Sequence, residues 1–202
     1  MDFLEGLFLG KVWSDTDFEN RRHFGLLILY ALIVDNIVLF SYVTGKYFGM
    51  LKVTDTWMIV IYALLFLACP FICFRYYRFP WWGKIPVLLE KAFKFFLVIC
   101  FTTAFVFSKI TVQSSDLQEF LINYLNGTLE KYTEKYYETA GSFATVIGVA
   151  AGGVHIVFVF VLNILAAIAF PIIVFLAFRL VQYGYDWLMN KFLIRKVFGK
   201  RG

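Results

Sequence analysis

The longest uncharged stretch of this chain covers residues 139–178, between Glu138 and Arg179. It holds 40 residues, whereas one helical crossing of a bilayer needs only about 20 apolar residues. The stretch is therefore too long for one ordinary transmembrane helix, and no charged residue divides it into two. The most economical assignment places a span at 155–178, and the glycine- and alanine-rich segment before that span then needs a separate explanation.

Composition explains why a membrane is the expected environment. Hydrophobic residues make up 61% of the 202 residues, charged residues only 16%, and the mean hydropathy is +0.74. Such a chain has too little polar surface to enclose a water-soluble globule. Three further windows, 23–45, 56–74 and 93–112, are long and apolar enough to span. The sequence therefore predicts an all-α integral membrane protein with four transmembrane helices.

The distribution of Lys and Arg predicts how these helices are oriented. The segments 1–22, 75–92 and 179–202, together with Lys94, contain 14 of the 19 Lys and Arg residues, whereas the loops 46–55 and 113–154 contain four. Basic residues gather on the cytosolic side of membrane proteins, so both termini are expected in the cytosol and 113–154 outside it. The predicted location is the inner (plasma) membrane of a bacterium. Membrane lipids, rather than nucleic acid, are the expected partners of this positive charge.

The N-terminal segment, 1–22, is expected to form a short amphipathic helix on the inner surface, followed by a capping box at Thr16 and Glu19. Its acidic residues are Asp2, Glu5, Asp15, Asp17 and Glu19. Attraction to anionic lipid does not explain acidic residues beside the inner leaflet. They are interpreted either as a solvated face or as a contact for a basic cytosolic protein, with Asp15, Asp17 and Glu19 as the candidate contact residues.

Two other cytosolic segments combine basic and aromatic residues. The stretch "RYYRFPWWGKIP" within 75–92 is typical of segments at the level of the lipid head groups, and Pro80, Gly83 and Pro86 are expected to prevent one continuous helix. An alternative role for this loop is packing against a neighbouring subunit. The tail, 179–202, is predicted to contact anionic lipid or an acidic partner through Lys191, Arg195 and Lys196.

Polar residues inside the predicted spans are Asp35, Asn36, Lys109 and Asn163. Asp35 and Asn163 fall at nearly the same depth, near the middle of the bilayer. An ionised group at this depth is unfavourable unless it is paired or reaches water, so one interpretation is an ion pair between Asp35 and Lys109. The others are an ion or proton pathway, or a polar joint between subunits that includes Thr102 or Thr103.

No pattern in the sequence predicts an enzyme, a metal site or a cofactor. The three cysteines, Cys69, Cys73 and Cys100, all lie in predicted spans, and packing of small apolar side chains is their expected role. Cys69 and Cys73 are one helical turn apart, but the sequence places no His or carboxylate beside them to complete a metal site. The phosphate-binding glycine loop and the nucleophile elbow are also absent from the sequence.

The outer region, 113–154, is predicted to be helical. Apolar residues recur every three or four positions across 116–139, which indicates an amphipathic helix with a possible break at Asn126 and Gly127. Beyond it, four small residues are spaced four apart and form a ridge predicted to pack in an oligomer: Ala140, Ala144, Gly148 and Gly152. This segment is expected either to re-enter the membrane and turn near Gly152, or to project as one straight helix of about 60 Å.

Two functions fit these features: a homo-oligomeric scaffold or sensor that anchors a cytosolic effector, or an oligomeric ion channel or pore. The cytosolic start, the four spans, the loop "RYYRFPWWGKIP", the outer helical region and the basic tail resemble the membrane subunit of the Kiwa anti-phage system. The resemblance lies in length and topology and identifies no site residues. It implies an inner-membrane oligomer that senses phage and is bound in the cytosol by a DNA-binding partner subunit.

Overall fold

The structure, a computed structural model, describes residues 2–14, 24–45, 56–110 and 112–197, and all regular secondary structure in these ranges is helical. The α-helices are α1 (Asp2–Leu9), α2 (Phe24–Thr44), α3 (Thr56–Cys73), α4 (Trp81–Phe107), α5 (Leu117–Ala140), α6 (Ala144–Met189) and α7 (Arg195–Val197). Two 3-10 turns, η3 (Tyr76–Arg78) and η4 (Gly141–Phe143), and a π-helical turn, η5 (Asn190–Ile194), complete the set. The predicted all-α class is confirmed.

Among the described residues, three helical segments are long and apolar enough to cross a membrane: Gly25–Thr44, Thr56–Cys73 and a stretch within Gly141–Val197. They correspond to three of the four spans predicted from the sequence. The fourth predicted span, 93–112, falls on α4, where only 13 residues follow Lys94 before the helix ends at Phe107. That apolar run measures about 20 Å, less than the hydrocarbon core of a bilayer. A membrane crossing by α4 remains a prediction.

The N-terminal part of α4 differs from the sequence-based expectation. The helix begins at Trp81, directly after Pro80, and continues through both Gly83 and Pro86. Pro80 has extended backbone dihedrals at the N-cap, where a missing N–H leaves no helical bond unmade. Pro86 lacks the N–H that would bond to the carbonyl of Trp82, but the helix continues despite this loss. The predicted interruption is therefore confirmed at Pro80, which separates η3 from α4, and is wrong at Gly83 and Pro86.

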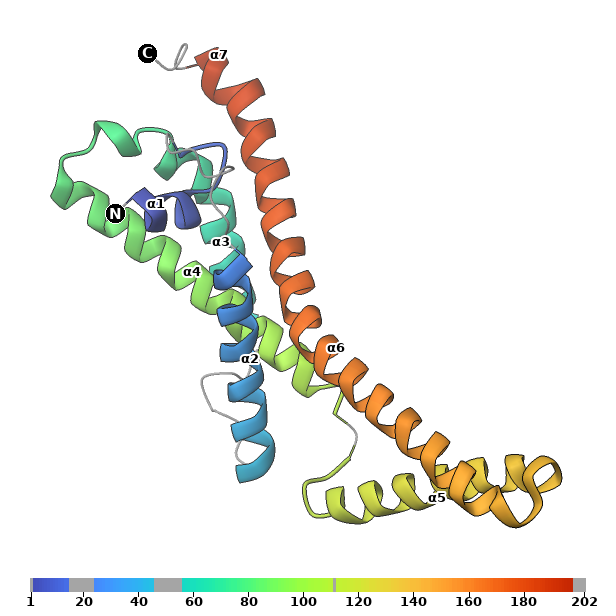
Figure 1. Cartoon of the computed structure of the whole chain (residues 1–202). Helices are drawn as coiled ribbons and strands as arrows, with labels where there is room; N and C mark the ends of the chain where they lie inside the picture. Colours follow the sequence, from blue (N-terminus) through green and yellow to red (C-terminus); the bar gives the residue numbers. More distant parts are fainter. Residues whose placement is uncertain (1, 15–23, 46–55, 111, 198–202) are drawn as a thin grey trace.

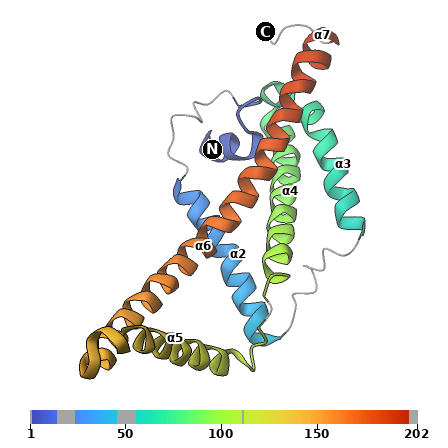
Figure 2. The same ribbon diagram turned by 90° about the vertical axis from the view of Figure 1, so that its right-hand side faces the viewer.

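Helices α4 and α6 form the centre of the bundle, and α2 and α3 each pack against both of them (Figures 1 and 2). One apolar cluster joins α2, α4 and α6 through Tyr30, Val34, Val38, Val98 and Phe175. A second cluster joins α1, α3, η3, α4 and η5 through Leu9, Trp13, Cys69, Cys73, Tyr76, Val87 and Ile194. Both α1 and α7 lie towards one end of the bundle, which we call the α1 end (Figure 1).

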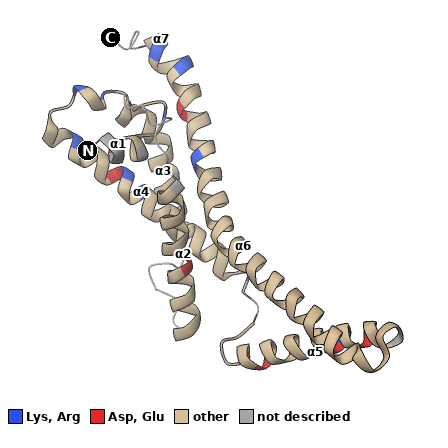
Figure 3. Cartoon of the chain, viewed as in Figure 1, with Lys and Arg blue, Asp and Glu red and all other residues tan. Residues whose placement is uncertain are grey.

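The charges of the described residues are distributed unevenly between the two ends. Figure 3 shows basic segments gathered at the α1 end, in the loop before α4, in α4 itself and in α7. Acidic segments mark α5 at the opposite end. Basic residues thus predominate at the α1 end, although acidic residues also occur there, and the α1 end is the predicted cytosolic end.

Helix α6 is continuous from Ala144 to Met189 and includes Gly152, Gly153 and Pro171. Its 46 residues correspond to a length of about 69 Å. The backbone is therefore one continuous helix, because no turn separates the glycine-rich segment from the rest of α6, and the placement of this segment relative to the membrane remains a prediction. Helix α5 is also continuous, and the possible break at Asn126 and Gly127 is absent.

The small-residue ridge of α6 packs against α5 of the same chain. Gly141, with a φ of +53°, lies at the turn between the two helices, which then run back along each other as a hairpin (Figures 1 and 2). A Cβ on Gly148 would lie 2.4 Å from the Cα of Thr133. A Cβ on Gly152 would lie 3.0 Å from a methyl carbon of Leu129. The close contact made by the ridge is therefore explained within one chain, and a role in an oligomer remains a prediction.

We expect Gly148→Ala to destabilise the α5–α6 hairpin by about 1–3 kcal/mol, because the added methyl group would meet the backbone of Thr133 and force the helices apart. Gly153→Ala is the matched control, since nothing lies within 4 Å of its Cβ. Thermal unfolding in detergent should show a lower Tm for Gly148→Ala and an equal or slightly higher Tm for Gly153→Ala. Equal Tm values for the wild type and Gly148→Ala would contradict this packing.

Candidate functional site

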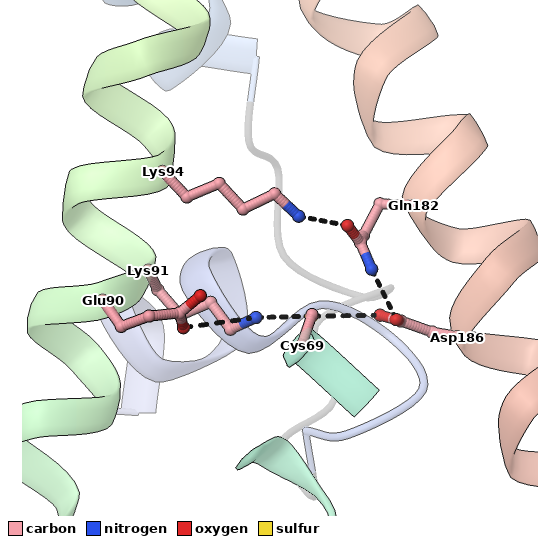
Figure 4. Close-up of polar contacts among 6 residues, drawn as sticks. All are labelled: Cys69, Glu90, Lys91, Lys94, Gln182 and Asp186. Carbon is pink, nitrogen blue, oxygen red and sulfur yellow. Dashed lines mark hydrogen bonds and ion pairs between the residues drawn. The ribbon is translucent and has the colours of Figure 1, made fainter. Parts of the chain in front are cut away.

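Six polar side chains meet between α3, α4 and α6 near the α1 end: Cys69, Glu90, Lys91, Lys94, Gln182 and Asp186 (Figure 4). We call them the polar network. Lys91, Lys94 and Asp186 expose only 5%, 8% and 3% of their surface. Charged residues are almost never buried to this extent unless they are paired, so the contacts within the network decide whether this part of the fold is stable.

Gln182 links the two helices at the centre of the network. Its Oε1 accepts a hydrogen bond from Lys94 Nζ of α4. Its Nε2 donates to Asp186 Oδ1, 2.5 Å away and one turn further along α6. The amide thus separates the ammonium group from the carboxylate and contacts both. Lys94 Nζ also lies over the rings of Phe66 and Tyr62 of α3, at 5.1 and 5.5 Å from their centroids.

The second half of the network involves Lys91 and Cys69. Lys91 Nζ donates to Cys69 Sγ and lies 3.6 Å from Glu90 Oε2. The Cys69 thiol in turn donates to Asp186 Oδ2 at 3.7 Å. Cys69 therefore links α3 to charged groups on both α4 and α6. The expectation that Cys69 is only a small apolar packing residue is wrong, because Asp186 and Lys91 reach it from other helices.

Helical spacing explains how the sequence builds this arrangement. Gln182 and Asp186 are four residues apart on α6, and Lys91 and Lys94 are three apart on α4, so each pair lies on one helical face. The continuous α4 is essential, because a break at Pro86 would not hold the two lysines in register with the rest of the helix. The two faces then meet where α4 and α6 approach each other.

Helix α1 and the turn after it cover this end of the bundle. Leu9 and Trp13 are buried in the second apolar cluster, and the Phe8 ring packs edge-on against Phe95 of α4. The Tyr76 hydroxyl donates to Glu5 Oε1 at 2.9 Å. Burial, and then the hydrogen bond to Glu5 and its charge, raise the pKa of the Tyr76 phenol, which therefore remains a donor. Glu5 is buried, so the expectation of a solvated face or partner contact does not apply to it.

A cavity of about 650 Å³ adjoins the polar network. It lies among the end of α1 with its following turn, α3, α4 and α6, and Lys91, Lys94, Gln182 and Asp186 form part of its lining. Lys11 and Arg179 contribute two further cationic groups. Aromatic and aliphatic side chains form most of the remaining surface, including Phe95, Val98, Phe175 and Phe178. The cavity therefore joins an apolar wall to a predominantly cationic one.

The ion pair expected between Asp35 and Lys109 is not formed. Asp35 is half-buried on α2, and its carboxylate forms no ion pair with any described residue. Lys109 is exposed, and its Nζ lies 5.3 Å from the ring centroid of Phe105 on the same segment. Thr102, proposed as part of an intramembrane polar group, instead shares a hydrogen bond of 2.7 Å with the Tyr30 hydroxyl.

The two intramembrane asparagines lie on the outside of the chain. Asn36 donates to the Leu32 carbonyl at 2.7 Å, and Asn163 donates to the Val159 carbonyl at 2.8 Å. Each side chain is thus bonded to its own helix and exposed. The structure does not bring Asn36, Asn163 and Asp35 together through any hydrogen bond among the described residues. A contact with another subunit remains a prediction for both asparagines.

The residues predicted to bind a cytosolic partner fall into two groups. Asp15, Asp17 and Glu19 lie outside the described residues, as does the expected capping box. Lys191, Arg195 and Lys196 are exposed beyond the end of α6. Lys191 Nζ lies 4.7 Å from the ring centroid of Trp187, so its stem follows an apolar surface while its charge is accessible.

No set of three or more His, Cys, Asp or Glu side chains capable of holding a metal ion occurs among the described residues. Cys69, Cys73 and Cys100 are all buried free cysteines. The contacts of the polar network are hydrogen bonds and an ion pair. Such contacts are suited to holding helices together or binding an ion or charged ligand.

Sequence reasoning did not identify the polar network as a site. Lys94 was used only for the orientation of the helices, and Gln182 and Asp186 were assigned to the basic tail. The sequence nevertheless contained a signal. Gln182 and Asp186 lie four residues apart, just after the last predicted span. Lys91 and Lys94 lie three residues apart, at the start of the predicted span 93–112. In an antiparallel pair of spans, such residues come to the same level of the membrane.

Comparison of the chain with protein-family models, with curated proteins and with solved structures finds no match.

We expect Asp186→Asn to lower the stability of the protein by about 1–3 kcal/mol, because it removes the carboxylate that accepts from Gln182 and Cys69 beside two buried ammonium groups. Asp116→Asn removes the same charge from an exposed position and serves as the control. Thermal unfolding in detergent measures both variants. A Tm for Asp186→Asn as high as that of Asp116→Asn would mean that the carboxylate has no stabilising role.

Proposed function

We propose that this chain is a non-enzymatic, homo-oligomeric membrane scaffold or sensor that holds a cytosolic effector protein at the inner membrane. The observation that carries the proposal is the continuity of α6. One end of this helix packs against α5 in the hairpin, and the other end contributes Gln182 and Asp186 to the polar network. A single continuous helix thus connects two regions at opposite ends of the molecule (Figure 1).

The length of α6 supports this role. Its 46 residues span about 69 Å, whereas a bilayer with its head groups is about 40–45 Å thick. Even with some tilt, part of the helix extends past the membrane. The charge distribution favours the hairpin as the outer part and the α1 end as the cytosolic part. A displacement of the hairpin on binding an external agent would then reach the cytosolic surface through the helix itself.

Exposed apolar surface on the hairpin favours an oligomer. Phe143, just before α6, and Val146, in its first turn, each expose 68% of their surface. Phe120 of α5 is also exposed. Apolar patches of this kind on an extracytoplasmic segment are typical of surfaces covered by another protein. The exposed amides of Asn36 and Asn163 are further candidates, because side-chain amides bond across helices in membranes.

The cytosolic partner is proposed to bind at the α1 end. The exposed side chains of Lys191, Arg195 and Lys196 offer positive charge there, and Asp15, Asp17 and Glu19 precede the first span in the sequence. If the resemblance to the Kiwa membrane subunit holds, the stimulus is phage at the cell surface and the effector is a DNA-binding subunit. In that case the chain would act by positioning its partner at the membrane.

We expect the protein purified in detergent to be an oligomer, and Val146→Glu to reduce its subunit number because it places a carboxylate in an apolar contact. Gln118→Glu adds the same charge at an exposed polar position of α5 and should leave the oligomer intact. Light scattering coupled to size-exclusion chromatography gives the subunit number. A monomeric wild-type protein, or an oligomer insensitive to Val146→Glu, would contradict a hairpin-mediated assembly.

The scaffold role predicts that a soluble protein co-purifies in a fixed ratio from native membranes. Replacement of Lys191, Arg195 and Lys196 by Glu should abolish that association without changing the subunit number, because these residues lie at the opposite end of α6 from the hairpin. Planar-bilayer recording of the same preparation tests the alternative function. Ionic currents altered by Asp35→Asn, in a protein that elutes without a partner, would favour the channel over the scaffold.

A further inference from the structure

We propose that the cavity beside the polar network binds an anionic phospholipid, with the phosphate against Lys94 and Arg179 and an acyl chain along the apolar wall. The two chemical halves of such a lipid match the two halves of the cavity lining. Basic pockets between helices on the cytosolic side of membrane proteins bind anionic lipid head groups in this way.

The charged side chains that line the cavity are mostly basic. Lys11, Lys91, Lys94 and Arg179 are among them, whereas Asp186 is the one acidic residue among the described residues of the lining. Both oxygens of Asp186 are already engaged, one by Gln182 and the other by Cys69. Basic side chains therefore outnumber acidic ones in the described lining, and the carboxylate of Asp186 is held by neutral donors.

Lys94 is the residue most in need of a ligand. It is buried, yet the contacts of its ammonium group among the described residues are with a neutral amide oxygen and two aromatic rings. No carboxylate of the described residues lies within ion-pair distance of it, whereas Lys91 has Glu90. An ammonium group carries three donors, and burying one without a counter-charge is unfavourable. A phosphate oxygen would supply both the charge and the missing acceptor.

The apolar half of the cavity fits an acyl chain. Phe95 and Val98 follow Lys94 along α4, while Phe175, Leu176 and Phe178 precede Gln182 along α6. Going from the lysine level into the bundle, the lining thus changes from charged to aromatic and aliphatic. At a volume of about 650 Å³, the cavity is large enough for a head group with part of one chain.

The exposed tryptophans near the start of α4 lie on the head-group side of this cavity. Trp81 and Trp82 expose 75% and 67% of their surface, and tryptophan at helix ends marks the level of the head groups. Lys91 and Lys94 follow about 15 and 20 Å further along the same helix, so the cavity lies on the bilayer side of the two rings. This inference depends on the membrane placement of the α1 end but does not require the scaffold function.

Native mass spectrometry of the full chain tests the proposal after incubation with equimolar phosphatidylglycerol and phosphatidylcholine. We expect wild-type protein to retain phosphatidylglycerol at least tenfold more than phosphatidylcholine. Lys94→Met should lose this preference, Lys94→Arg should keep it, and Lys131→Met, which removes the same charge from an exposed position on α5, should leave it unchanged. Phosphatidylglycerol should also raise the Tm of the wild type more than phosphatidylcholine does.

Two results would overturn the proposal: equal retention of the two lipids by the wild type, or an unchanged preference in Lys94→Met. Inorganic phosphate at the same concentration distinguishes a lipid site from a simple anion site. An equal rise in Tm with phosphate alone would reject the lipid. If Lys94→Met does not fold, Arg179→Gln provides the same comparison from the α6 side, and a preference retained in that variant would count against the site.

Discussion

Buried charge determines how the helices of this protein fit together at the α1 end. Apolar helices gain little from contacting one another in a lipid environment, so close packing and polar contacts decide their relative positions. Lys94, Gln182 and Asp186 connect α4 to α6, and Cys69 brings α3 into the same network. Removal of one partner would leave another charge buried, so the position of each helix depends on all the others. The cover formed by α1 is part of the same arrangement, because it keeps these groups away from bulk water.

The opposite end of α6 is held by a different kind of interaction. At Gly148 the backbones of α5 and α6 approach so closely that a single methyl group has no room, and no charged group takes part. Contacts of this kind are rigid, because backbone atoms cannot move aside in the way that flexible side chains can. The helix therefore combines steric packing at the hairpin with hydrogen bonding at the α1 end.

Hydropathy and charge predicted most of the helices but not how they pair. The apolar windows were sufficient for α2, α3 and the middle of α6, and the three- and four-residue periodicity was sufficient for α5. The continuation of α6 to Met189 was not predicted, because 179–202 was assigned to a basic tail. The spacing of Ala144, Gly148 and Gly152 correctly indicated a close helix contact, yet spacing alone does not identify the partner, which in this structure is α5 of the same chain. The extension of α4 through Pro86 was missed because local propensity argued against it. The polar network was missed because its members are separated in sequence by up to 117 residues, as with Cys69 and Asp186.

The difference between the two ends of α6 bears on the direction in which a signal could pass. If the hairpin moves, its close packing moves the N-terminal half of α6 as one body. At the other end, Lys94 and Gln182 have long side chains that can exchange one acceptor for another when α6 shifts. A small displacement of the helix would therefore change which groups contact Lys94 and, with them, the cavity beside it. In the proposed scaffold, the hairpin would accordingly be the part that detects the stimulus, and the α1 end would be the part whose contacts change in response.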